Sequence, residues 1–104
     1  MPGIAELPQP PYFAVIAPAV LRPDVSGYAQ TAQATLRAAQ AVVGFHGIEM
    51  CAQPGFSIAV SYWRSLDAID EWRHHARHER AKALGRSRWF SAYATRIAQV
   101  VDAY

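Results

Sequence analysis

Apolar residues recur along the chain with two different periods, and the change from one period to the other predicts six elements. Short apolar runs or an alternation of apolar and polar residues are typical of strands, and apolar residues spaced three or four apart are typical of helices. The order is strand, helix, strand, strand, helix, strand. The expected ranges are 12–21, 26–43, 45–51, 56–63, 65–84 and 93–101.

This order predicts an α+β fold, the ferredoxin-like βαββαβ split, in which two helices lie on one face of an antiparallel four-stranded sheet. Asp24 or Ser26 is expected to cap the first helix, and Gly44 to end it. The apolar stripe of that helix is expected to consist of Tyr28, Ala32, Leu36, Ala39 and Val43.

The second helix has equally clear signals at its ends. Ser65 is expected to cap it, with Asp67 in the first turn, where the helix dipole favours a negative charge. Gly85 is expected to end it. Its buried stripe is expected to hold Ala68, Ile69, Trp72 and Ala76.

The strand at 56–63 has one face of large apolar residues and one face of small residues. The large face holds Phe56, Ile58, Val60 and Tyr62, and we expect it to form the core. The other face holds Ser57, Ala59, Ser61 and Trp63, and it leaves room for another chain, a helix or a ligand. In the first strand, Pro18 indicates an edge position or a strand end, because proline donates no hydrogen bond to a ladder.

Both faces of the last strand are apolar as well, since Ala94, Ala98 and Val100 alternate with Tyr93 and Ile97. Two helices cover only one face of the sheet. Soluble monomers rarely expose a large apolar patch, so the pattern predicts a homodimer that packs sheet against sheet.

Composition fits one domain of 104 residues, 52% of them hydrophobic. We expect residues 1–11, which contain four prolines, to form an extended arm and residues 12–104 to form the domain. No apolar run approaches the roughly 20 residues of a membrane span. Cys51 is the only cysteine, which excludes an intrachain disulfide and a Cys-rich metal site and favours a cytoplasmic location. The basic residues between Arg73 and Arg88 predict a solvated helix face, because no nucleic-acid-binding motif accompanies them.

The segment 61–90 holds all three Trp and three of the four His of the chain. This crowding has two readings, a strand–helix core element or the wall of a ligand site. His74 and His78 are four residues apart, as are His75 and Glu79, but no third ligand is evident and we expect no metal site.

The stretches PPYFAVI, SYWRSLDAIDEW and GRSRWFSAYATRIAQV, together with the region of His78, resemble the antibiotic biosynthesis monooxygenase family over most of the chain. The resemblance implies a dimeric α+β barrel with a pocket in each subunit between sheet and helices. It also implies a monooxygenase that acts on a small aromatic, quinol-like molecule without a cofactor. Such chemistry needs a dry aromatic pocket, a base and a group that stabilises negative charge.

The resemblance makes Trp72 and His78 the candidate catalytic residues. Arg64 or Arg96 is the candidate for stabilising negative charge. The candidate substrate-binding residues are Ser61, Tyr62, Trp63, His75 and Trp89. A haem-degrading branch suggests the alternative of haem binding with His78 as axial ligand, and a third reading is a non-catalytic small-ligand protein. The active branches place an Asn in the pocket, and this chain contains no Asn.

Overall fold

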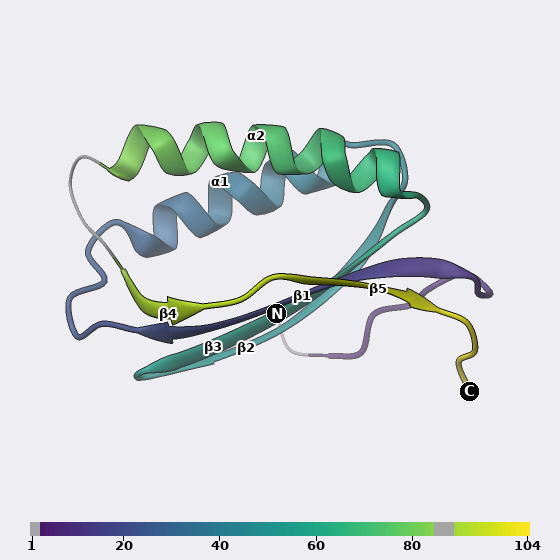
Figure 1. Ribbon diagram of the computed structural model, residues 1–104, viewed down its shortest axis with the longest axis horizontal. Helices are drawn as coiled ribbons and strands as arrows, with labels where there is room; N and C mark the ends of the chain where they lie inside the picture. Colours follow the sequence, from purple (N-terminus) through teal and green to yellow (C-terminus); the bar gives the residue numbers. More distant parts are fainter. Residues whose placement is uncertain (1–2, 85–88) are drawn as a thin grey trace.

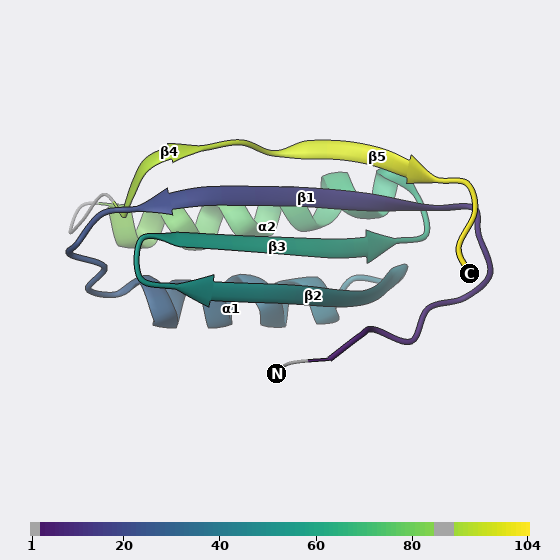
Figure 2. The same ribbon diagram turned by 90° about the horizontal axis from the view of Figure 1, so that it is seen from below.

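One antiparallel sheet carries both helices on a single face (Figure 1). The computed structural model describes residues 3–84 and 89–104, except for the side chains of residues 78–84. The elements are β1 (Tyr12–Leu21), α1 (Tyr28–Gln40), β2 (Phe45–Gln53), β3 (Phe56–Trp63), α2 (Leu66–Leu84), β4 (Phe90–Tyr93) and β5 (Arg96–Val100). The strands lie in the order β2-β3-β1-β4, and β5 also pairs with β1 (Figure 2). This arrangement confirms the ferredoxin-like α+β fold.

The last strand, expected at 93–101, begins earlier, at Phe90, and is divided into two segments, and Pro18 explains the division. Tyr93 of β4 pairs with Ala19, and Arg96 of β5 pairs with Ile16, so both segments keep one register along β1. Pro18 lies between these pairs, and its carbonyl accepts a hydrogen bond from the backbone N–H of Ala94 at 3.1 Å. Pro18 has no N–H, so it cannot donate the second hydrogen bond of the pair to Ala94. The prediction that Pro18 marks an edge or a strand end was therefore wrong, because β1 is an interior strand.

The two faces of β3 are used in the opposite way from the prediction. Trp63 is fully buried and belongs to the core cluster together with Val15 of β1 and Ile69 of α2. Side chains alternate along a strand, so the small face of β3 meets the helices and the large face points away from them. Phe56, on that large face, remains 40% exposed. The expected core face is instead the bare face of the sheet.

The start and the buried stripe of α1 also differ from the prediction. Gly27, with φ of 84°, occupies the N-cap position, and no side chain caps the helix. Asp24 instead accepts hydrogen bonds from the backbone N–H and the hydroxyl of Ser26, which forms a turn before the helix. Val42 is buried and Val43 is 75% exposed, because the regular helix ends at Gln40.

The second helix follows the prediction closely. Ser65 Oγ accepts a hydrogen bond from the backbone N–H of Ala68 at 3.1 Å, which is the expected N-cap. Ala68, Ile69 and Ala76 are buried, and Trp72 packs against the core. The expected end at Gly85 lies outside the described residues. Over the residues that the structure describes, neither helix combines the length and the apolar character needed to cross a membrane.

Residues 3–11 run from the start of β1 back past the edge of β2, on the side of the sheet away from the helices (Figures 1 and 2). The backbone N–H of Ala5 donates to Glu49 Oε2 at 3.1 Å. Gly47 leaves room for this approach, since a Cβ there would lie 3.2 Å from the Cβ of Ala5. The segment thus covers part of the β2 edge and leaves the part of the bare face around Val20 and Phe56 open.

Candidate functional site

A hollow lies between the helices and the sheet, and we call it the inner hollow. It consists of two adjacent cavities of about 200 Å³ and about 370 Å³. The larger value falls within the roughly 300–1,000 Å³ that is usual for small-molecule sites. Both cavities are lined by Val15, Ala17, Tyr28, Ala32, Thr35 and Trp72.

The hollow follows from the sizes of the residues on the helix-facing side of the sheet. At one end, Phe13, Phe45 and Trp63 pack against the helices and fill the space. At the other end the central strands β1 and β3 present small side chains, among them Ala17 and Ala59, which face each other across the two strands. A helix surface lined by alanine and threonine does not fill the remaining depth. The small face of β3 therefore provides the room that the sequence predicted.

Trp72 is the largest of the side chains that line both cavities. Its indole Nε1–H donates to the backbone carbonyl of Thr35 at 3.0 Å, which links α2 to α1. Its ring lies against that of Trp63, with ring centroids 5.1 Å apart and an interplanar angle of 32°. Because its N–H is already bonded, Trp72 offers a ligand an aromatic surface rather than a donor.

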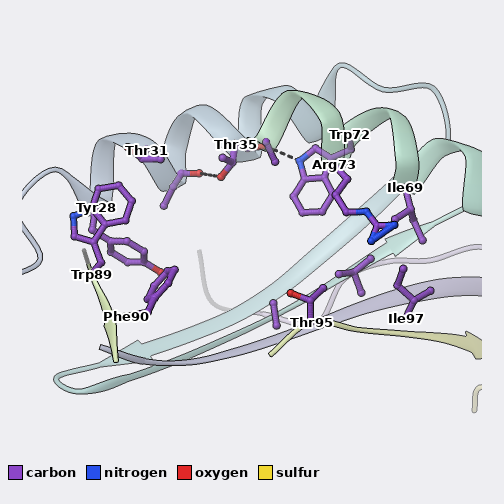
Figure 3. A pocket seen from close by; sticks show the side chains of 14 residues that line it. Tyr28, Thr31, Thr35, Ile69, Trp72, Arg73, Trp89, Phe90, Thr95 and Ile97 are labelled. Atoms are coloured by element: carbon purple, nitrogen blue, oxygen red, sulfur yellow. Dashed lines mark hydrogen bonds between the residues drawn. The ribbon is translucent and has the colours of Figure 1, made fainter. Parts of the chain in front are cut away.

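Three aromatic residues close the far end of the smaller cavity. Trp89 donates from Nε1 to the carbonyl of Ser26 at 2.8 Å, and Tyr28 packs edge-on against both Trp89 and Phe90. Figure 3 shows Tyr28 extending from α1 into the space above the sheet. The hydroxyl of Tyr28 makes no hydrogen bond within the part of the chain that the structure describes. Tyr28 was predicted only as a member of the helix stripe, so sequence reasoning missed it as a site residue.

The polar groups of the inner hollow are few. Thr31, Thr35 and Thr95 contribute hydroxyls to the smaller cavity, and the hydroxyl of Thr35 donates to the carbonyl of Ala32 at 2.9 Å. Arg73 is the only charged residue among the described side chains that line it. Arg64 and Arg96, which we expected to stabilise negative charge, do not line the hollow.

The structure brings some of the predicted site residues to the hollow and leaves others away from it. Trp72 and Trp89 line the smaller cavity, and Ser61 lines the larger one, where its Oγ accepts a hydrogen bond from Trp63 Nε1 at 2.9 Å. Trp63 itself lies in the core and does not reach the space. His75 is exposed on α2 outside the lining. The side chain of His78 lies outside the described residues.

Tyr62 lies on the opposite face of the sheet from the hollow. Its hydroxyl donates to Glu49 Oε1, and its ring meets that of Tyr12 edge-on. Burial, together with the hydrogen bond to Glu49, raises the pKa of Tyr62 to about 12. Tyr62 therefore belongs to the bare side of the sheet and not to a wall of the inner hollow.

The described walls carry none of the groups that usually hold a metal ion, and the side chain of His78, the expected axial ligand of haem, lies outside the described residues. No imidazole, thiol or carboxylate lines the hollow among the described side chains. Haem iron is usually held by a histidine or a cysteine thiolate. No group of three or more His, Cys, Asp or Glu residues capable of holding a metal occurs among the described residues.

Comparison with known proteins gives one close relative. The uncharacterised protein YqjZ of Bacillus subtilis (strain 168) is 44% identical over 101 residues, which cover 96% of this chain and 89% of YqjZ. No profile of a known protein family matches the chain. The similarity is high enough, and long enough, to place both proteins in one family.

Solved structures with this fold include oxygenases. Rv0793 of Mycobacterium tuberculosis matches with a TM-score of 0.73 and 23% identity, over 88% of this chain and 97% of Rv0793. SnoaB of Streptomyces nogalater, a cofactor-independent oxygenase, matches with a TM-score of 0.64 and 12% identity, over 86% and 92% of the two chains. A Bordetella bronchiseptica protein assigned to the antibiotic biosynthesis monooxygenases matches with a TM-score of 0.65 and 15% identity, over 88% and 99%. The expected resemblance to that family is thus confirmed in the fold.

Proposed function

This chain belongs to the family of Bacillus subtilis YqjZ and has the fold of the antibiotic biosynthesis monooxygenases, and we propose that it oxygenates a small hydroxylated aromatic compound without a cofactor. The observation that carries the proposal is the inner hollow, which is walled by Trp72, Trp89 and Tyr28 and lies within one subunit. Flat aromatic walls suit a flat aromatic ligand, because stacked and edge-to-face ring contacts add to the free energy of burial.

The proposed reaction needs no protein group that accepts electrons. The ionised substrate gives one electron to dioxygen, and the resulting radical pair joins as a peroxide on a ring carbon. Loss of water from that peroxide leaves a carbonyl group, so a dihydroxynaphthalene and dioxygen give a hydroxynaphthoquinone and water. One oxygen atom enters the product and the other leaves in the water, and the substrate supplies all the electrons.

The residues of the hollow support these steps through binding and electrostatics. The aromatic and alanine walls cover much of a bound ligand and remove water from that part of its surface, which strengthens electrostatic interactions with the bound anion. The positive charge of Arg73 at the cavity favours the ionised form of a phenolic substrate. The hydroxyls of Tyr28 and Thr95 line the same cavity and supply hydrogen-bond donors.

We also propose that the protein is a homodimer in which two sheets pack through their bare faces. Val20 and Phe56, which pair across β1 and β3, are 43% and 40% exposed in the single chain. Pro18 and Ala92 lie beside them in a shallow depression of the same surface. A second copy that covers this surface removes an apolar patch from water.

The experiment compares a variant that fills the hollow with a matched variant that does not. Ala32→Phe adds a ring at a position that lines both cavities and leaves the other wall residues in place, and Gln30→Phe places the same ring on the exposed side of α1. Each purified protein is incubated with a dihydroxynaphthalene and isotopically labelled dioxygen, with and without a metal chelator.

We expect the wild type and Gln30→Phe to form labelled quinone in the presence of the chelator. Ala32→Phe should lose most of this activity while keeping the circular dichroism spectrum of the wild type. Equal turnover by Ala32→Phe and the wild type would show that the chemistry does not occur in the inner hollow. Absence of labelled product from the wild type would overturn the proposal for this substrate class.

A further inference from the structure

The smaller cavity has a polar group at each end and aromatic surface between them. Figure 3 shows Tyr28 at one end and Arg73 at the other, with Trp72 beside Arg73. We infer that the natural ligand is a hydroxylated aromatic carboxylic acid, whose carboxylate binds Arg73 and whose hydroxyl meets Tyr28. This inference rests on the proposed function, because it names the substrate class for the same hollow.

Arg73 has the geometry of a carboxylate receptor. Its Nη2 is 3.0 Å from Asp70 Oδ1, a single contact within one turn of α2. The side chains of Arg73 and Asp70 are 40% and 69% exposed, so solvent weakens this pair and a second partner can compete with it. A guanidinium presents several N–H donors in a planar fork, and most of them are not used by one bond to Asp70. The remaining donors can bind a carboxylate in the same plane.

The charge of the cavity favours a carboxylate over a phosphate. Arg73 is the only charged residue among the described lining side chains, and Asp70 already offsets part of its charge. A monoanion matches one partly neutralised guanidinium, whereas a phosphate monoester carries nearly two charges and usually requires more cations. The mainly apolar lining adds to this preference, because burial of uncompensated charge is costly.

Tyr28 supplies the second polar contact. Trp72 and Trp89 donate their N–H groups to backbone carbonyls, so neither indole is available to hydrogen-bond the ligand. The hydroxyl of Tyr28 has no described protein partner, whereas Thr95 lines the cavity nearer to Ile97 (Figure 3). Tyr28 lies about 10 Å along α1 from Thr35, the residue bonded to Trp72, because α-helical residues rise by about 1.5 Å each. A length of about 10 Å along α1 leaves room for a ligand with two fused rings between Tyr28 and the end of the cavity at Trp72 and Arg73.

The test measures binding of a hydroxynaphthoic acid whose hydroxyl and carboxyl groups lie at opposite ends of the ring system. Its methyl ester has the same shape without the charge. Binding is followed by quenching of tryptophan fluorescence and by calorimetry, both for the wild type and for Arg73→Gln, Tyr28→Phe and Asp70→Asn. Arg77→Gln is the matched control, since Arg77 is an exposed residue one turn further along α2 and outside the cavity lining.

We expect the wild type to bind the acid about tenfold more tightly than the ester, the size of a charge-assisted hydrogen bond at a partly exposed site. Arg73→Gln should remove this difference, and Arg77→Gln should keep it. Asp70→Asn should tighten binding of the acid by about twofold, because it removes a competitor for the guanidinium. Tyr28→Phe should weaken binding of the acid and of the ester by a similar factor, because both ligands carry the hydroxyl.

Equal affinity of the wild type for acid and ester would overturn the carboxylate inference and leave the proposed oxygenation of neutral aromatics intact. A preference for the acid that survives in Arg73→Gln would also overturn it. If the wild type binds neither ligand but still forms labelled quinone from a dihydroxynaphthalene, the substrate class is wrong and the proposed function stands. If it does neither, both proposals fail.

Discussion

The bare face of the sheet gives the sharpest prediction about assembly. Phe56 lies on β3 and points away from the helices, and 40% of it is exposed in the single chain. We expect Phe56→Ala to weaken the proposed dimer strongly while leaving the subunit folded. The loss of binding free energy should count twice per dimer, because a two-fold symmetric interface contains the same residue from both subunits.

The size of the effect follows from the exposed area. A phenylalanine buries roughly 150–250 Å², so the exposed 40% corresponds to roughly 60–100 Å² that a partner can cover. At about 25 cal/mol per Å², this area contributes about 2 kcal/mol per copy and about 4 kcal/mol per dimer. Since each 1.4 kcal/mol changes the dissociation constant about tenfold, the upper limit is about a thousandfold weakening.

Sedimentation velocity over a dilution series measures the dissociation constant directly. Leu66→Ala is the matched control, because Leu66 is 50% exposed but stands at the first residue of α2, on the helix side of the molecule. We expect Leu66→Ala to keep the mass of two chains at concentrations where Phe56→Ala has the mass of one. An equal dissociation constant for all three proteins would refute the sheet-to-sheet arrangement.

Three further substitutions test individual contacts. Trp72→Phe removes the hydrogen bond to Thr35 and should lower the free energy of unfolding by about 1 kcal/mol in urea titrations; an unchanged midpoint would contradict this. The pKa of the Tyr62 hydroxyl is raised to about 12 in the folded protein, so in the unfolded chain this hydroxyl loses its proton at a lower pH. The free energy of unfolding of the wild type should therefore fall as the pH rises from 10 to 12. Tyr62→Phe, which also lacks the bond to Glu49, should show a smaller loss over that range in thermal melts. Gly44 has a φ of 105°, a conformation that strains alanine, so Gly44→Ala should lower the free energy of unfolding by about 1–3 kcal/mol and lower the melting temperature with it. An unchanged melting curve would argue against that backbone conformation.

The local pattern of the sequence predicts the elements well, because alternation and turn residues are local signals. The bounds of β1 and β3 agree with the prediction, since proline residues flank β1, Gly55 precedes β3, and the helix cap Ser65 follows β3 closely. Val43 was misplaced because a helical stripe does not show where the last turn ends. Pro18 was placed at an edge because proline cannot donate a hydrogen bond to a neighbouring strand. The rule does not say which neighbouring strand would have accepted that bond.

The assignment of the two faces of β3 shows a deeper limit of single-chain reasoning. Large apolar residues such as Phe56 normally mark the core, so the pattern favoured that face. In this fold the helices cover the other face, and the large side chains are left for a surface outside the subunit. The sequence did not predict that Tyr28 and Arg73 line the same cavity, for a related reason. They come from different helices, and only the packing of α1 beside α2 brings them to one cavity.

The two faces of β3 thus serve different purposes: one face lines the inner hollow, and the other belongs to the surface that we assign to the dimer. The small residues that face the helices create the inner hollow, and the large residues between them create the surface that we assign to the dimer. The hollow is already formed by the walls of a single chain, so we expect the ligand site to survive loss of the dimer. We therefore expect Phe56→Ala, once monomeric, to bind the hydroxynaphthoic acid as tightly as the wild type does. A parallel loss of binding would mean that the second subunit shapes the hollow, for example by holding β1 and β3 in the curvature that keeps α1 away from Ala17 and Ala59.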